Sequence, residues 1–366
     1  MKNVKIINPA AGAIVMALGI FLYAGIEAFP LLDQMLGEIL TILLGIIGVV
    51  IYTSLTRQFL HKDFLLPFLS NPVNSFVMGA WIAGISVLCN VILKYFPEVI
   101  VWVQVIAVVN TLCWFVFLGF CVYNFQQLWK WQASYSIHGV ILLSTVATQS
   151  LVIVWSESLP FLLTDMVVIS VLYFGLFFYL CGVYLIGVRY KREKQWTLTE
   201  DWTNTNCIIH GALSITGLAI VSTQLMSSLF IMIFWVMVFS LLLVVETVEI
   251  MRAVTRIREY GWRKGIFTYN ISQWSRNFTF GMFYAFTMTM HENPYYMNAM
   301  YHFHEEFLTW WAWIVLFTLI GEIGLWFEAK WHSVQRKKES TACVKPSQTT
   351  RKQAIRMNGK SHNVNR

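Results

Sequence analysis

The chain has 366 residues, of which 57% are hydrophobic, 16% aromatic and 12% charged. This composition is far more apolar than that of a soluble globular domain, and it excludes one. The net charge of +7 belongs to the C-terminal end, because residues 329–366 hold ten bases and one acid while residues 1–328 hold sixteen bases and eighteen acids. The body of the chain lacks the basic excess of a nucleic-acid-binding protein, so we expect no nucleic-acid partner.

Ten apolar stretches are each long enough to cross ~30 Å of hydrocarbon as an α-helix. The first stretch has no small-residue cleavage pattern, so we expect it to remain as the first helix rather than to be removed as a signal peptide. Together the stretches predict an all-α polytopic protein that is embedded in a lipid bilayer. They lie near residues 8–28, 34–55, 73–93, 99–123, 136–156, 161–187, 205–226, 229–250, 268–290 and 307–327.

Lys and Arg residues fall in alternate connections between these stretches. Fourteen of the sixteen bases before residue 329 follow this alternation, and the opposite connections hold Lys94 as their only base beside nine acids. Cytoplasmic loops retain Lys and Arg, whereas short translocated loops do not. The sequence therefore predicts a multi-pass protein of the cell membrane with both termini in the cytoplasm.

Composition divides the chain into two parts. Residues 1–328 form the predicted ten-helix transmembrane domain, and residues 329–366 form a basic, polar tail with few large apolar side chains. Such a segment buries too little apolar surface to fold by itself, so we expect it to be disordered and to lie near anionic headgroups.

The beginnings of the odd-numbered stretches resemble one another. Asn8-Pro9 opens the first stretch and Asn71-Pro72 the third, while Ile137-His138-Gly139 opens the fifth and Ile209-His210-Gly211 the seventh. All four lie at the predicted cytoplasmic side. The repeating unit is a helical hairpin, so the ten helices are predicted to form five hairpins.

Uncharged polar residues and glycines concentrate in the odd-numbered stretches, while the even-numbered ones are richer in large aliphatic residues. Polar groups that face lipid cost free energy, so these groups should face one another or water. Small and hydroxyl residues also mediate ordinary helix packing, which is the alternative for each of them. The segregation favours an inner ring of odd-numbered helices around a central pore. The candidate pore-lining residues are Asn74, Ser75, Ser144, Thr145, Gln149, Ser214, Thr216, Asn277, Gly19, Gly79, Gly139, Gly217 and Gly281.

The cytoplasmic ends of the five inner helices form a predicted vestibule. All five helices enter the membrane N-terminus first, so their positive dipole ends and unpaired N–H groups gather there. His138 and His210 lie at two of these ends, and Arg276 is the only base inside a predicted span. These groups favour anions over cations, and we take Arg276, His138 and His210 as the candidate anion-binding residues.

Two acids of the eighth stretch, Glu246 and Glu249, can be interpreted as proton relays, because ionisable groups at membrane depth are often functional. Their position on an even-numbered helix instead favours pairing with Arg252 or Arg256.

Short motifs in this arrangement resemble a known family. The Val146-Ala147-Thr148-Gln149-Ser150-Leu151 run, and Trp274 followed four residues later by Phe278, are similar to those of bacterial tellurite-resistance permeases, fungal malate (C4-dicarboxylate) transporters and plant guard-cell slow anion channels. The resemblance covers residues ~8–328 through topology. It implies a homotrimer with a pore in each protomer and a phenylalanine gate, Phe278, on the ninth helix.

The chain departs from that family directly after the gate residue. The family often has Pro at that position, whereas here Thr279 follows Phe278, and the fifth, seventh and ninth stretches contain no Pro. Phe280 and Phe283 are therefore alternative gate residues.

The sequence thus predicts an anion channel or carrier, not an enzyme, that moves small inorganic anions, tellurite or C4-dicarboxylates such as malate, passively or with protons. We expect no cofactor and no metal site, since the six cysteines have neither CxxC nor ligand spacing and no nucleotide-binding loop is found. The alternative is a membrane-embedded oxidoreductase that uses His138 and His210 as haem or metal ligands.

Overall fold

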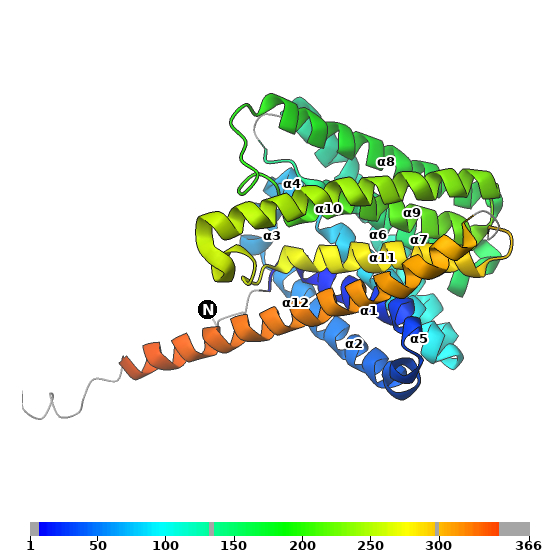
Figure 1. The fold of residues 1–366 in the computed structure, drawn as a ribbon, viewed down its shortest axis with the longest axis horizontal. Coiled ribbons are helices and arrows are strands. Elements are labelled where there is room, and N and C mark those ends of the chain that lie inside the picture. The colour runs from blue at the N-terminus through cyan, green and yellow to red at the C-terminus, as the bar shows by residue number, and fades with distance from the viewer. Residues whose placement is uncertain (1–6, 132–134, 297–299, 344–366) are drawn as a thin grey trace, which may run out of the picture. The chain divides into compact units, whose positions relative to one another are not determined.

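The computed structural model describes residues 7–131, 135–296 and 300–343, and every regular element in these ranges is helical (Figure 1). Ten of the described helices have twelve or more residues. They are α1 (Gly12–Tyr23), α2 (Pro30–Phe59), α5 (Met78–Tyr95), α6 (Ile100–Lys130), α7 (Leu143–Ser158), α8 (Asp165–Arg192), α9 (Ile208–Thr223), α10 (Ser228–Gly265), α11 (Trp274–Glu292) and α12 (Tyr301–Cys343). Of these, α8, α10 and α11 run roughly side by side in Figure 1. The short ones are η1 (Pro9–Ala11), η2 (Gly25–Ala28), α3 (Lys62–Ser70), α4 (Pro72–Ser75), η3 (Pro97–Val99), η5 (Gly139–Leu142), η6 (Pro160–Leu162), η7 (Asn204–Cys207) and η8 (Ile271–Gln273).

Eight helical segments in the described ranges are long and apolar enough to cross a membrane, as expected of a multi-pass membrane protein. Each of the ten stretches predicted from the sequence contains a helix. Two of these helices are not among the eight. α1 is short even together with η1, and α11 carries Arg276, Asn277 and several threonines along its length.

Five helices form a closed ring at the centre of the molecule. α1 packs against α5, α5 against α7, α7 against α9, α9 against α11, and α11 returns to α1. Burial distinguishes these helices from the rest: 89% of the membrane-length stretch is buried in α7 and in α9, against 28% in α2 and in α6. The odd-numbered helices predicted from the sequence are therefore the inner ones.

The even-numbered helices cover the ring from outside. α2 packs against α1 and α5, α6 against α5 and α7, α8 against α7 and α9, and α10 against α9. Large apolar side chains on their outer faces are exposed, among them Ile42 of α2, Phe115 of α6 and Val244 of α10. In a bilayer these faces contact lipid, which accounts for aliphatic residues all around the even-numbered helices.

Each inner helix begins with a separate short turn. η1, α4, η5, η7 and η8 precede α1, α5, α7, α9 and α11. Four of these turns have a side-chain cap that accepts a hydrogen bond from the N–H two residues further on, and the caps are Asn8, Asn71, His138 and Asn270. A capped turn satisfies N–H groups that the helix itself leaves unpaired. Three of the four repeated sequence motifs, at Asn8, Asn71 and His138, therefore mark helix starts, whereas Ile209-His210-Gly211 lies inside α9, after η7.

Glycines lie at all five contacts between neighbouring inner helices. A Cβ atom on Gly19 would lie 2.7 Å from Val87, one on Gly79 2.5 Å from the Leu143 carbonyl oxygen, one on Gly217 2.5 Å from Phe286, and one on Gly281 2.6 Å from Ile20. A Cβ on Gly139 would collide with the Thr205 backbone. These five candidates for the pore lining are thus located where backbones approach closely, as small residues do between membrane helices.

The chain divides into two compact units, residues 1–320 and residues 321–366. The second unit contains the rest of α12, which continues to Cys343. Residues 329–343, expected from composition to be disordered, are therefore helical, because the apolar pattern that favours the helix is followed by good helix formers. The remainder of the predicted tail, 344–366, lies outside the described residues.

Candidate functional site

A cavity of about 190 Å³ lies where the five inner helices begin. Every inner helix or its starting turn contributes to the wall, so the cavity lies on the axis of the ring. Most of the lining is apolar, with a few hydroxyl, amide and imidazole groups. The lining residues are Asn8, Ala10, Ala13, Met16, Val77, Ala80, His138, Val140, Leu143, Thr205, Ile208, Ile271, Ser272, Ser275 and Phe278.

Phe278 is the one predicted gate residue that lines this cavity. It lies in the second turn of α11 and is 1% exposed. Ile271 and Ser275 precede it at spacings of seven and three residues, which places all three on the same helical face toward the axis.

Phe280 and Phe283 point to a different part of the molecule. The Phe280 ring lies 5.2 Å from Trp311 of α12, measured between ring centroids, and the Trp311 indole donates to the Phe280 carbonyl. The Phe283 ring stacks on Trp235 of α10 at 5.5 Å. Both rings belong to an aromatic cluster between α10, α11 and the first half of α12, away from the cavity.

His138 lines the cavity and caps η5. Its Nδ1 lies 2.8 Å from the Thr205 hydroxyl and accepts from the Val140 N–H. It precedes the membrane-spanning segment Gly139–Ser158. Burial, together with the positive charge of Arg189, lowers the pKa of His138 to about 4. His138 is therefore neutral between pH 5 and 8 and offers the cavity a dipole rather than a charge.

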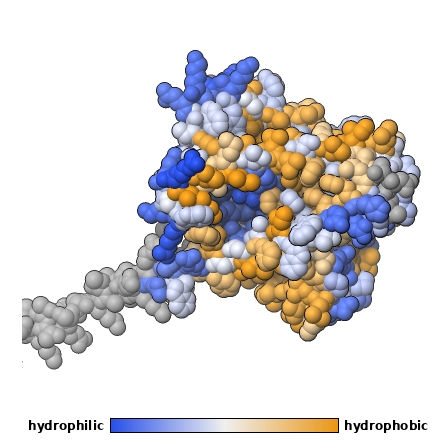
Figure 2. Space-filling model, viewed as in Figure 1, coloured by the Kyte–Doolittle hydropathy of each residue, from blue (hydrophilic) through white to orange (hydrophobic). Residues whose placement is uncertain are grey.

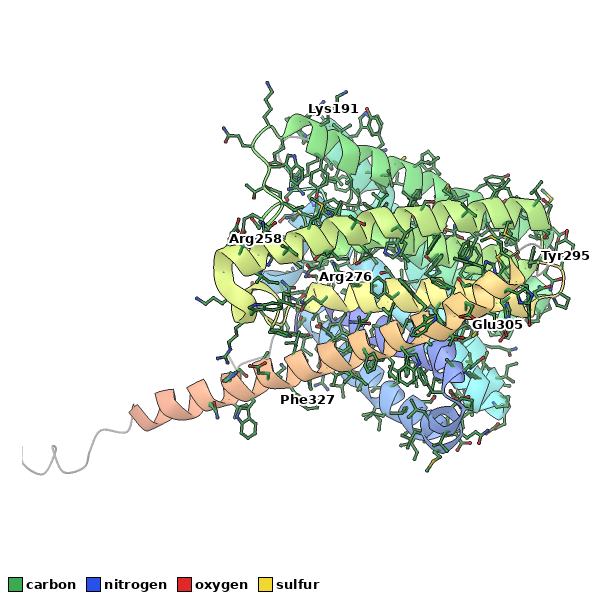
Figure 3. The ribbon with its side chains drawn as sticks, in the orientation of Figure 1. Lys191, Arg258, Arg276, Tyr295, Glu305 and Phe327 are labelled. Carbon is green, nitrogen blue, oxygen red and sulfur yellow. The ribbon has the colours of Figure 1, made fainter. Side chains whose placement is uncertain are left out.

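Arg276 does not line the cavity, and its charge is compensated. Its Nη2 lies 2.9 Å from Glu249 Oε1 and its Nε 3.4 Å from Glu246 Oε2, both on α10. Glu249 also pairs with Arg252, at 3.1 Å, as the sequence suggested. Figure 3 shows Arg276 at the start of α11, beside α10. The sequence did not predict the pairing, because it needs α10 and α11 to lie side by side.

His210 belongs to this charged group and not to the cavity. The side chain is fully buried, its Nε2 lies 3.6 Å from Glu246 Oε1, and its ring faces Phe280. His138 lines the axial cavity while His210 faces α10, so the two imidazoles do not face a common ligand position. The described residues also contain no group of three or more His, Cys, Asp or Glu that could hold a metal ion.

Most predicted pore-lining polar groups bond away from the axis. Thr145 donates to the Gly175 carbonyl and Gln149 to the Leu172 carbonyl, both on α8. Ser75 accepts from Asn124 of α6.

The other polar candidates also lie outside the cavity wall. Ser144, Ser214 and Thr216 each donate to a carbonyl of their own helical segment. Asn74 is exposed beside the start of α5, and Asn277 lies one turn before Gly281, on the face of α11 toward α1. Sequence reasoning missed Thr205, Ser272 and Ser275, of which Ser275 could have been found from its three-residue spacing to Phe278.

No protein-family model matches this chain, and no curated protein sequence matches it.

Proposed function

We propose that the protein moves small anions across the cell membrane along the axis of the five-helix ring, passively or together with protons. The observation that carries the proposal is the cavity of about 190 Å³ at the converging N-terminal ends of the five inner helices, with Phe278 in its wall. Five helix N-termini directed at one point favour negative charge there.

The size of the cavity supports the proposal that the transported solute is small. Pockets for drug-sized ligands have volumes of about 300–1,000 Å³, so a cavity of 190 Å³ suits an inorganic anion or a compact dicarboxylate such as malate. Its apolar wall also supports a channel or carrier over a tight binding protein, because weak contacts allow an ion to leave as well as to enter.

The proposal includes ten membrane spans with both termini in the cytoplasm, and a homotrimer with one pore in each protomer. Alternation of Lys and Arg in the connections supports the orientation. The trimer rests on the family resemblance, and native mass spectrometry in detergent tests it.

Flux into proteoliposomes tests the function. Chloride, nitrate, malate and tellurite are offered separately, with and without a pH gradient, and potassium serves as the cation control. We expect at least one anion to move faster than potassium. If potassium moves and none of the anions does, the proposal is wrong.

A further inference from the structure

A group of charged and titratable side chains lies on the faces of α9 and α11 that point away from the cavity. His210 of α9, Glu246, Glu249 and Arg252 of α10, and Arg276 of α11 are joined by contacts of 2.9 to 3.6 Å. We call these five residues the charged cluster. Arg252 additionally donates to Asn204 of η7, at 2.6 Å.

The charges of this cluster balance only when His210 is neutral. Two arginines compensate two glutamates, so a proton on His210 adds one positive charge at membrane depth. The imidazole is 0% exposed, and its Nδ1 has no hydrogen-bond partner among the described residues. Burying an ionisable group at membrane depth costs free energy that an apolar side chain would not, so His210 is a candidate for a functional role.

Glu246 is the partner suited to exchange a proton with His210. Glu249 contacts two arginines, whereas Glu246 lies between Arg276 and His210. On its other side the His210 ring faces the Phe280 ring, at 6.4 Å between ring centroids. The Phe280 ring carries no charge.

The cluster is accessible from outside the ring. The side chains of Glu246 and Arg276 are 16% and 23% exposed, while His210 behind them is not exposed. Figure 2 shows hydrophilic atoms recessed in a largely apolar face, at the place where Figure 3 labels Arg276 beside α10. In the proposed route, protons reach His210 through Glu246, on the side of the ring away from the cavity.

We propose that His210, with Glu246 as its proton partner, is the proton-binding site that couples proton movement to anion movement in this protein. The inference rests on the proposed function. Ile208 and Phe278 line the cavity from the same two helices that carry His210 and Arg276, so one helix width, ~10 Å, separates the added charge from the anion. At an effective dielectric constant of about 20, one unit charge at that distance favours the anion by roughly tenfold. By thermodynamic linkage, a bound anion must raise the proton affinity of His210 by the same factor.

The test measures proton and anion movement together in proteoliposomes that contain a fluorescent pH indicator. For the wild type we expect an acidic exterior to accelerate anion uptake about tenfold and to acidify the lumen in proportion to uptake. His210→Gln should lose both effects, and Glu246→Gln should weaken both. His61→Gln, which changes an exposed imidazole between α2 and α3, is the matched control and should behave as the wild type. Proton movement that persists in folded His210→Gln would overturn the inference while leaving anion transport in place.

A second measurement is independent of transport. In ¹⁵N-histidine-labelled protein in detergent, the signal that His210→Gln removes should change as the pH is varied, and Glu246→Gln should shift the midpoint of that change. A His210 signal that does not respond to pH would contradict proton binding even if no tested anion moves. Absent anion flux with a titrating His210 would instead count against the proposed function and support the proton site.

Discussion

At the scale of single residues, three phenylalanines of α11 differ in what their rings contact. Phe278 borders the axial cavity, while Phe280 and Phe283 fill an aromatic cluster with Trp235 and Trp311. A spacing of two and five residues on a helix turns side chains to different faces. The same residue type therefore supports different roles within two turns.

Truncation of Phe278 tests its role as a gate. Phe278→Ala removes a ring from the wall of the axial cavity and should raise anion flux without changing the order of anion preference. Phe283→Ala is the matched control, because Phe283 is a packed core ring outside the cavity wall. Its loss should cost ~3–5 kcal/mol of stability and should not raise anion flux. Flux assays and thermal unfolding in detergent measure both effects. A Phe278→Ala protein that loses stability without gaining flux would make Phe278 a packing residue.

Substitution of Arg276 should lower the stability of the protein more than it changes the preference for anions over cations. Arg276→Ala leaves Glu246 and Glu249 with one compensating arginine, and breaking a buried pair from one side costs about 3–5 kcal/mol. Adding Glu246→Gln should recover part of this loss, because Glu246 loses its arginine partner while Glu249 keeps Arg252. Thermal unfolding of the single and double variants measures the effect. Unchanged stability together with reduced anion preference would instead support the vestibule role expected from the sequence.

His138 should make the free energy of unfolding depend on pH below pH 6.5. Its pKa of about 4 lies below the usual 6.5, so the stabilising neutral form is fully present above pH 6.5 and is lost as the pH falls toward 4. As the pH falls over that window, the difference in free energy of unfolding between the wild type and His138→Gln should shrink by about 1–3 kcal/mol. Parallel unfolding curves from pH 4 to 8 test this. A constant difference would show that His138 does not titrate there.

At the scale of helices, the ring depends on close backbone approach at glycines. Gly79→Ala places a methyl group 2.5 Å from the Leu143 carbonyl oxygen, so α5 and α7 must separate, and we expect a loss of about 1–3 kcal/mol or more. Gly119→Ala in α6 is the control, since a Cβ there meets nothing within 4 Å and alanine favours the helix. Thermal unfolding compares the two variants. Equal stabilities would mean that the ring tolerates a wider contact at this position.

Polar side chains of the inner helices also hold the outer ones in place. Gln149 bonds to α8, and Asn124 of α6 bonds to Ser75. In hydrocarbon these hydrogen bonds have no competing water, which favours them as contacts between helices. Their role in packing explains why the concentration of polar residues in odd-numbered helices did not by itself identify the pore wall.

At the scale of the whole molecule, the orientation in the membrane can be tested directly. In a cysteine-free background, Glu98→Cys should react with a membrane-impermeant thiol reagent from outside the cell, and Glu193→Cys only after the membrane is opened. Lys94, the one base of the outer connections, pairs with Glu27 at 2.6 Å, so its charge does not oppose this orientation. Labelling of Glu193→Cys in intact cells would contradict cytoplasmic termini.

The helical class, the membrane environment and the division into inner and outer helices were predictable from sequence. Hydrocarbon thickness sets the length of the apolar stretches, and the absence of water forces backbone hydrogen bonds into helices. Polar and small residues must be shielded from lipid, so their concentration in alternate stretches predicts which helices form the ring. The two Asn-Pro motifs and His138-Gly139 likewise marked where inner helices begin, whereas His210-Gly211 lies within α9.

The identity of the lining residues was decided only by the tertiary structure. Thr145 and Gln149 are as polar as any pore residue, yet the rotation of α7 turns them to α8, while Ser275 and Phe278 of α11 turn to the axis. The sequence predicted Arg276 as an uncompensated charge in the vestibule, but in the structure it pairs with two carboxylates of α10, ~30 residues away in sequence. Apolar patterning specifies which helices are inside, but helix rotation and long-range charge pairing depend on packing between partners that a single stretch does not encode.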